Sequence, residues 1–270
     1  MHKHSPILPL LLLASLLPLH VAAADQADKK ISLEDFIRAH VASKQEIDVF
    51  LNEMSWAQFD PLVGYIMGSY MPRDGIDGSS TFSTVRPDGA RTSFMYTDRP
   101  CRINTYGDSF TQCHQVSDGE TWQEYLAGHL GEPVRNFGMG GFGFYQASRR
   151  MLREEQTENS AEYVLLYIWG DDHVRSLLRC RYMYTASWNR SQDSKEGKGR
   201  MFHGNFWSNV EMNLATGEIE EHKSRISKRE NLYRMTDPDW MVENLKDDLA
   251  LAMGLYARGR INVIDVARLK

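Results

Sequence analysis

The chain has 270 residues, which suits one domain with an attachment or two small domains and allows a sizeable buried core. Its formal net charge of −5, with no block of Lys and Arg residues, argues against nucleic acid as a partner. The three cysteines, Cys101, Cys113 and Cys180, are too few for a disulfide framework and lack the paired spacing of a zinc site. We therefore expect free or buried thiols and no metal or other cofactor.

The first 24 residues have the pattern of a secretory signal peptide. Lys3 gives a weakly positive start, residues 7–19 form an apolar core, and small residues at 22–24 offer a cleavage site before Asp25. A membrane anchor is the alternative, but this apolar run is shorter than the roughly 20 residues that span a bilayer. No other stretch is long and apolar enough to cross a membrane. We expect a secreted or periplasmic protein with no membrane span after signal cleavage.

Residues 25–99 are predicted to form an N-terminal extension. Apolar residues recur at helical spacing over residues 31–53, which indicates one or two amphipathic helices, and Ser32 with Asp35 can cap the first. Residues 59–99 are rich in Gly, Pro, Asp and Ser with scattered aromatic residues, which is typical of irregular coil and short strands.

Residues 100–270 alternate between strand and helix patterns. One helix is bracketed by a capping box at Ser117 and Glu120 and by Gly131. The segment EYVLLYIW is a nearly continuous apolar run of the kind buried on both faces of a parallel sheet. Such alternation predicts an α/β fold with a central parallel sheet that helices cover on both faces. The expected strands are 102–106, 133–137, 162–169 and 261–267, and the expected helices are 118–130, 145–156 and 239–259.

Residues 179–236 interrupt this alternation and are expected to be an insert. The insert is rich in aromatic and charged residues, and residues 209–222 alternate around a Gly-containing turn, which predicts a β-hairpin. A long insertion at the active edge of a sheet is often a lid or a substrate wall. A surface excursion without a role is the alternative, and the sequence does not separate the two.

Ser109 is the candidate nucleophile. It lies in YGDSFTQC, directly after a predicted strand and on a turn eased by Gly107, so its hydroxyl is expected to point into the crevice at the sheet edge. The backbone N–H of Ser109 is then available to an oxyanion, and the glycine-rich NFGMGGFG after the next strand can supply a second donor. The end of YVLLYIWGDD can supply a third. Three strand ends thus bring together groups suited to acyl transfer.

The same glycines permit a competing interpretation. Gly138, Gly140 and Gly143 satisfy the G-x-G-x-x-G pattern of dinucleotide-binding proteins. However, the acidic residues that end the next strand, Asp171 and Asp172, lie farther along than the spacing of about 20 residues typical of ribose binding. The strand before the glycines is also short and polar, and an exported protein needs its nucleotide loaded before or after export. These points favour the oxyanion role.

Taken together, YGDSFTQCHQVSDGETWQEYLA, VRNFGMGGFG and YVLLYIWGDDH resemble the sequence blocks of the SGNH (GDSL-type) hydrolases, over roughly residues 100–175. FDPLVGYIMG also resembles a lead-in segment of some members. This resemblance implies a flavodoxin-like three-layer α/β/α fold and the activity of a serine esterase or acyltransferase. It gives Ser109 the role of nucleophile, Gly141 the role of oxyanion glycine, and Asp108 the role of holding the nucleophile turn.

The chain departs from this family at Asp171. The family's third block normally reads Gly-x-Asn-Asp, with the Asn amide as an oxyanion donor, whereas Asp171 occupies that position here. An ionised carboxylate only accepts hydrogen bonds, so Asp171 can donate only if burial raises its pKa. Otherwise Asp171 is structural and the donor lies elsewhere.

The second departure concerns the general base. The family uses the His of a late Asp-x-x-His block, and no such block follows INVIDVARLK. A natural chain that continues beyond Lys270, a base supplied from elsewhere, or a loss of catalysis would each explain this, and we expect the first. Within the given chain, His173 is the attractive substitute because it lies two residues past Asp171, although a structural role within its loop suits it better. Of the other candidates, His114 suits a solvated loop, and the positions of His203 and His222 cannot be derived from the sequence.

The sequence thus predicts an exported SGNH-type serine hydrolase that cleaves an ester of a small molecule or a carbohydrate, with Ser109, Gly141 and Asp171 as site residues. Two alternatives remain. One is an O-acyltransferase that modifies an extracellular glycan, which the aromatic insert suits. The other is a non-catalytic binding protein on the same fold, which Asp171 and the missing base favour.

Overall fold

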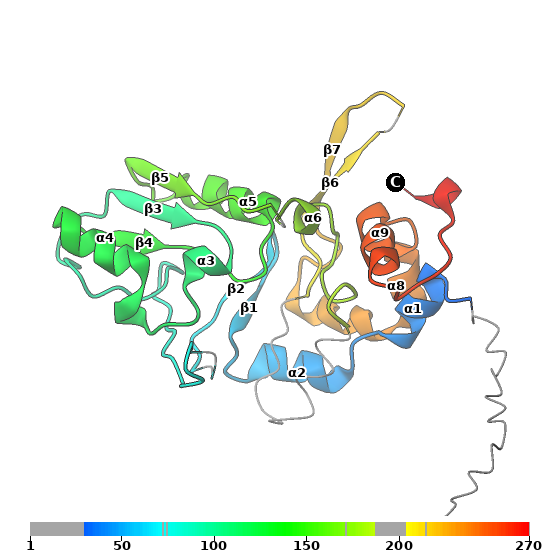
Figure 1. Ribbon diagram of the computed structural model, residues 1–270, viewed down its shortest axis with the longest axis horizontal. Helices are drawn as coiled ribbons and strands as arrows, with labels where there is room; N and C mark the ends of the chain where they lie inside the picture. The colour runs from blue at the N-terminus through cyan, green and yellow to red at the C-terminus, as the bar shows by residue number, and fades with distance from the viewer. Residues whose placement is uncertain are drawn as a thin grey trace, which may run out of the picture.

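The computed structural model describes residues 30–71, 73, 75–170, 172–186, 204–213 and 215–269. The predicted signal peptide, residues 1–24, lies outside them. Figure 1 shows two halves side by side, which we call the sheet half and the helical half. The sheet half contains β3 (Ile103–Tyr106), α3 (Ser109–Gln112), α4 (Trp122–Leu130), β4 (Val134–Asn136), α5 (Phe144–Glu154) and β5 (Tyr163–Leu166). The helical half contains α1 (Leu33–Ala39), α2 (Lys44–Asn52), η2 (Arg229–Thr236), α8 (Pro238–Leu245) and α9 (Leu249–Ala257).

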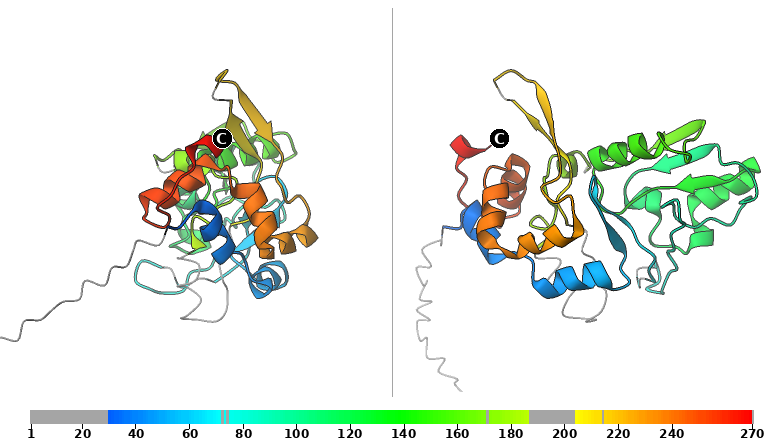
Figure 2. Two further views of the ribbon diagram at one scale, coloured as in Figure 1. Left: turned by 90° about the vertical axis from the view of Figure 1, so that its right-hand side faces the viewer. Right: turned by 180° about the vertical axis from the view of Figure 1, so that it is seen from behind.

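The helices expected over residues 31–53 are confirmed as α1 and α2. The Ser32 hydroxyl accepts a hydrogen bond from Asp35 N, and the Asp35 carboxylate accepts one from Ser32 N, so this pair caps α1 as predicted. The following segment forms a short antiparallel hairpin of β1 (Ala57–Asp60) and β2 (Gly64–Met67). This hairpin lies between the two halves in Figure 1 and in the rear view of Figure 2.

The central sheet is parallel and has the strand order β4–β3–β5. Successive side chains of a strand point to opposite faces of its sheet. On one face of β3, Ile103 packs with Ala127 of α4, and on the other face Tyr106 packs with Met151 of α5. The predicted α/β class is therefore confirmed, with a helix on each face of the central strand.

The helix expected at 118–130 is present but divided. A 3-10 turn, η1 (Asp118–Glu120), comes first, and Thr121 then takes an extended conformation and caps α4. The helix ends at Gly131, whose φ of +75° is the left-handed conformation that favours glycine at this position. The predicted stop is confirmed, whereas the predicted capping box at Ser117 and Glu120 belongs to η1, and Thr121 starts α4.

The prediction that EYVLLYIW is buried on both faces is wrong. In β5, Tyr163, Val164 and Leu165 are 50%, 38% and 45% exposed. The cause is the position of β5 in the sheet: β3 pairs with one of its edges, and no described strand pairs with the other. An apolar strand is buried only where a neighbour and a covering layer reach it.

The C-terminal prediction is also wrong in part. The helix expected at 239–259 is two helices, because the backbone of Asp248 is extended and its side chain caps α9. Residues 261–267, expected to be a buried strand, form none. Asn262 N instead donates to Ile31 O, Asn262 Oδ1 accepts from Ile31 N, and a 3-10 turn, η3 (Val266–Arg268), follows. The segment thus belongs to the helical half, away from the sheet (Figure 1).

The hairpin expected at 209–222 is confirmed as β6 (Asn209–Met212) and β7 (Ile219–His222), which projects from the junction of the two halves (Figure 2). Other described parts of the insert are buried: Met183, Phe206 and Trp207 belong to the same core as α1, α2, α8 and α9. The insert is therefore a part of the main core.

Along the described ranges, no helix has both the length and the apolar character of a membrane span.

Candidate active site

Ser109 lies at the carboxyl edge of the sheet, as predicted. β3 ends at Tyr106, the chain turns at Gly107, and Asp108 caps α3 by accepting a hydrogen bond from Phe110 N at 2.9 Å. Ser109 is thus the first residue of α3, and it is partly exposed. Its N–H has no hydrogen-bond acceptor among the described residues. The backbone donor that the sequence analysis assigned to an oxyanion is therefore available.

The glycine-rich loop after β4 packs against this turn. Met139 N donates to Gly107 O at 3.0 Å, and Gly140 N donates to the side-chain oxygen of Gln112 at 2.6 Å. Gly141 follows with φ +79° and is partly exposed. As with Ser109, no described residue accepts a hydrogen bond from the Gly141 N–H. The loop thus ties up the N–H of Gly140 and leaves that of Gly141 free at the same edge of the sheet.

Asp108 has the buried position expected of a residue that holds the nucleophile turn. Its side chain is 2% exposed, and one oxygen lies 3.8 Å from Nη1 of Arg175. Burial raises the pKa of Asp108, while the Phe110 N–H and the Arg175 charge oppose that rise. Asp108 therefore acts on the backbone of the turn and has no path to the Ser109 hydroxyl through a described side chain.

The third predicted site residue, Asp171, lies outside the described residues, so the structure does not bear on its role. His173, the candidate substitute base, lies on α6 (Asp172–Ser176) with an exposed side chain. Nothing in the described ranges accepts a hydrogen bond from the Ser109 hydroxyl, His173 included. His114 is half-buried in the loop after α3, and His222 lies on β7, 3.7 Å from Glu211. His203 lies outside the described residues.

Two arginines that the sequence analysis missed support this edge of the sheet. Arg91 comes from the N-terminal extension and is 1% exposed. It donates to the carbonyl oxygens of Gln112 and Cys113 at 2.6 and 2.7 Å and pairs with Asp118 at 2.8 Å, so it holds the C-terminal end of α3. The second, Arg181, comes from the insert and lies against Gly141. Neither has a local sequence pattern that signals its role, because the contacts join distant parts of the chain.

An aromatic surface lies next to Ser109. Phe110 and Trp169 are 59% and 50% exposed, and their ring centroids are 5.8 Å apart. Tyr167 lies at the same distance from Phe110, and Trp122 Nε1 donates to Phe110 O at 3.2 Å. Aromatic rings from α3, α4 and the segment after β5 therefore gather around Phe110, the residue that follows Ser109. The sequence pointed to the aromatic residues of the insert and gave no signal for this surface.

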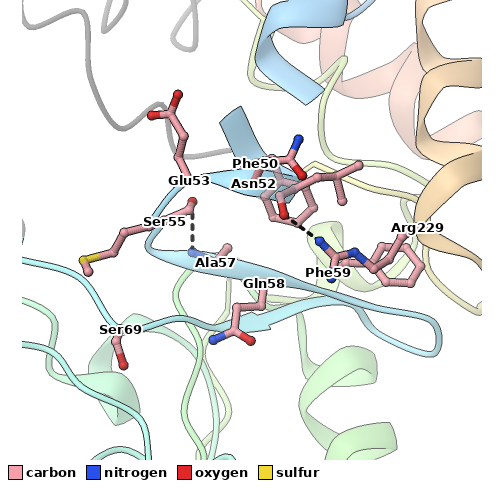
Figure 3. Close-up of a pocket in the computed structure, with 11 residues that line it drawn as sticks. Phe50, Asn52, Glu53, Ser55, Ala57, Gln58, Phe59, Ser69 and Arg229 are labelled. Carbon is pink, nitrogen blue, oxygen red and sulfur yellow. Dashed lines mark hydrogen bonds between the residues drawn. The ribbon is translucent and has the colours of Figure 1, made fainter. Parts of the chain in front are cut away.

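A pocket of about 420 Å³ lies elsewhere, between the end of α2 and the β1–β2 hairpin (Figure 3). Arg229 crosses it to donate to Leu51 O at 2.5 Å, and Ser55 accepts from Ala57 N on its far side. Neither Ser109 nor Gly141 lines this pocket.

Within the described residues, no group of three His, Cys, Asp or Glu side chains is placed to hold a metal ion. Comparison with models of protein families gave no match, and comparison with curated proteins gave none either.

Proposed function

We propose that this protein is an exported serine hydrolase of SGNH type, with a flavodoxin-like three-layer fold, that cleaves ester bonds through Ser109. The proposal is carried by two backbone N–H groups, of Ser109 and Gly141, that lie at one edge of a parallel sheet and have no acceptor in the described part of the chain. The strand order β4–β3–β5, with helices on both faces of β3, is consistent with that fold. Two preorganised donors beside a hydroxyl are the elements that acyl transfer needs.

In the proposed reaction, Ser109 Oγ forms a bond to the acyl carbon while the C=O π electrons move onto the carbonyl oxygen. The N–H groups of Ser109 and Gly141 donate to that oxyanion. Collapse of the intermediate restores the C=O bond and expels the alcohol oxygen, which takes a proton. Water then hydrolyses the acyl-serine and restores the hydroxyl. A general base has to accept the proton of Ser109, so the reactivity of Ser109 reports whether such a base is present.

The aromatic surface favours a second candidate, the transfer of an acyl group to a glycan. Phe110 follows Ser109 in the chain and its exposed ring lies near that of Trp169, and flat rings can stack on the faces of sugar rings. In that reaction a sugar hydroxyl replaces water in the second step. A sugar acceptor that increases the turnover of an activated ester and becomes acylated would favour the transferase over the hydrolase.

The test is intact-mass analysis of the exported protein before and after treatment with a fluorophosphonate, which forms a covalent adduct with activated serines. We expect one adduct on the wild type and none on Ser109→Ala. Ser148→Ala is the matched control, since Ser148 is also a half-buried serine on a helix, and its hydroxyl donates to Tyr145 O. It should label like the wild type. A wild type that takes no adduct contradicts the proposal and favours the alternative of a non-catalytic binding protein. The same spectrum tests signal cleavage, which predicts a mature chain that starts at Asp25.

A further inference from the structure

Arg181 lies directly against the glycine that is expected to bind the oxyanion. A Cβ built on Gly141 would be 1.7 Å from Arg181 Nη1, so the guanidinium occupies the space that a side chain at position 141 would need. Because a Cβ lies about 2.5 Å from its own backbone nitrogen, Nη1 is within about 4 Å of the Gly141 nitrogen. A positive charge therefore lies close to the backbone nitrogen of Gly141, whose N–H has no acceptor among the described residues.

The Arg181 guanidinium is not neutralised by any described carboxylate. Its Nε is buried and has no hydrogen-bond partner, and its side-chain hydrogen bond goes to the hydroxyl of Tyr65. Burial lowers the pKa of Arg181, and the like charge of nearby Arg175 acts in the same direction. Arg181 as a whole is half-buried, and a partly desolvated cation without a described counter-charge gains when negative charge develops next to it.

We propose that Arg181 is the third component of the oxyanion hole, a catalytic cation that stabilises the negative charge developing on the carbonyl oxygen beside Gly141. This inference rests on the proposed function. In this assignment the insert supplies the third oxyanion stabiliser. The SGNH hydrolases that the sequence resembles have an Asn amide for that purpose, at the position that Asp171 occupies here. The contact with Arg181 also explains why position 141 is a glycine, since any side chain there would displace the guanidinium.

Tyr65 acts as the positioning residue for Arg181. It lies on β2, is fully buried, and donates from its hydroxyl to Gly140 O at 3.4 Å. Its ring packs edge-on against Phe142, with centroids 5.3 Å apart. Tyr65 thus links the N-terminal extension to both the glycine loop and Arg181. In this assignment the extension holds the catalytic cation in place.

The test compares Arg181→Gln and Arg181→Lys with wild type, using p-nitrophenyl acetate as a neutral substrate. We expect Arg181→Gln to lower kcat about 100-fold, the usual effect of removing one oxyanion stabiliser, with little change in KM. Lys keeps the charge without the planar geometry, so Arg181→Lys should recover part of kcat. Tyr65→Phe keeps the charge of Arg181 but removes the hydroxyl that bonds with both Gly140 O and Arg181, and it should lower kcat less than Arg181→Gln. The melting temperature of each variant shows whether it folds.

Arg258→Gln is the matched control. Arg258 donates a hydrogen bond to Tyr184 O, three residues after Arg181, and its guanidinium stacks on the Tyr184 ring. This variant therefore removes one positive charge near Arg181 without changing a neighbour of Gly141. It should keep the wild-type kcat. A folded Arg181→Gln with wild-type kcat overturns the inference while Ser109 still takes its adduct. An effect seen only in KM, and only with the anionic p-nitrophenyl hemisuccinate, also overturns it and makes Arg181 a substrate-binding residue. A wild type without an adduct at Ser109 rejects the proposed function itself.

Discussion

The sheet half and the helical half differ in what they bury. The helical half shares one large apolar core, which includes Ile37 of α1, Leu245 of α8 and Leu251 of α9, all fully buried. Met139, Phe142 and Ala147 of the sheet half reach this core, and the other buried apolar residues of the sheet half form two clusters of three each. Much of its interior is polar instead, and Arg91 and Arg150 are among its largest buried side chains. The half that carries Ser109 is therefore held together largely by hydrogen bonds and ion pairs.

This difference has a consequence for the site. Hydrogen bonds have defined geometry, whereas apolar contacts tolerate small shifts. Gln123, for example, donates to Thr111 O at 2.8 Å and to Thr105 Oγ1 at 3.1 Å, which links α4 to both β3 and α3. Directional contacts of this kind position the turn at Ser109. Such a design makes the sheet half sensitive to the loss of a single polar side chain.

The largest effect is expected from Arg91→Met. This change leaves Asp118 and several carbonyl oxygens, including those of Gln112 and Cys113, without their buried partner. Removing one member of a buried ion pair typically costs about 3–5 kcal/mol of the free energy of unfolding. Urea unfolding followed by circular dichroism measures that loss. Arg102→Met is the control, because the Arg102–Glu162 pair at 3.1 Å is solvent-exposed on both sides and is expected to contribute under about 1 kcal/mol. Equal losses in the two variants would contradict a polar basis for the sheet half.

The sequence predicted the local features of this fold and missed the long-range ones. Capping signals such as Ser32 with Asp35, and Gly131, act within one helical turn, so a short stretch of sequence contains the whole signal. Arg91 reaches Gln112 across 21 positions, and Tyr65 reaches Gly140 across 75. No periodicity records such contacts. The positions of Ser109 and Gly141 after the ends of β3 and β4 were predicted, and the contacts from distant segments that support them were missed.

The wrong predictions have a physical cause of the same kind. EYVLLYIW and residues 261–267 are both apolar and rich in β-branched or aromatic residues, which indicates buried strands. Burial of a strand, however, depends on what lies beside it. In the structure β5 lies at the edge of the sheet, and Asn262 bonds with Ile31 in the helical half. The strand propensity of these residues is real, but their place in the tertiary structure determines whether they form a strand and whether they are buried.

A second prediction compares two leucines, one from each half. Leu251 of α9 is fully buried in the apolar core, and Leu165 of β5 is 45% exposed. Leu251→Ala is expected to cost about 2–5 kcal/mol, since it removes buried methyl groups and leaves a cavity. Leu165→Ala removes surface that is already partly hydrated and should cost under about 1 kcal/mol. Urea unfolding of the two variants gives both values. A loss at Leu165 as large as that at Leu251 would mean that a further layer covers β5 in solution.

The smallest effect is expected from Asp248 of the helical half, a carboxyl group whose pKa is strongly shifted. It shows how much free energy of unfolding a polar group costs in an apolar core. Burial raises the pKa of Asp248 to about 6, although Leu251 N donates to it at 2.9 Å. The folded state therefore binds a proton between about pH 4 and pH 6 that the unfolded chain releases. The free energy of unfolding should fall as pH rises through this window, by about 3 kcal/mol at most, and then level off.

Asp248→Asn tests this expectation, because an amide carries no charge at either pH and can still cap α9. Unfolding free energies measured at pH 4, 5, 6 and 7 should decline less steeply for this variant than for wild type. Asp237→Asn is the control, since Asp237 caps α8 in the same way but is exposed. It should leave the wild-type slope unchanged. If Asp248→Asn follows the wild-type curve as well, the Asp248 carboxyl group does not cause the pH dependence. Its burial then costs no measurable free energy of unfolding, and the buried polar groups of the two halves do not differ in this respect.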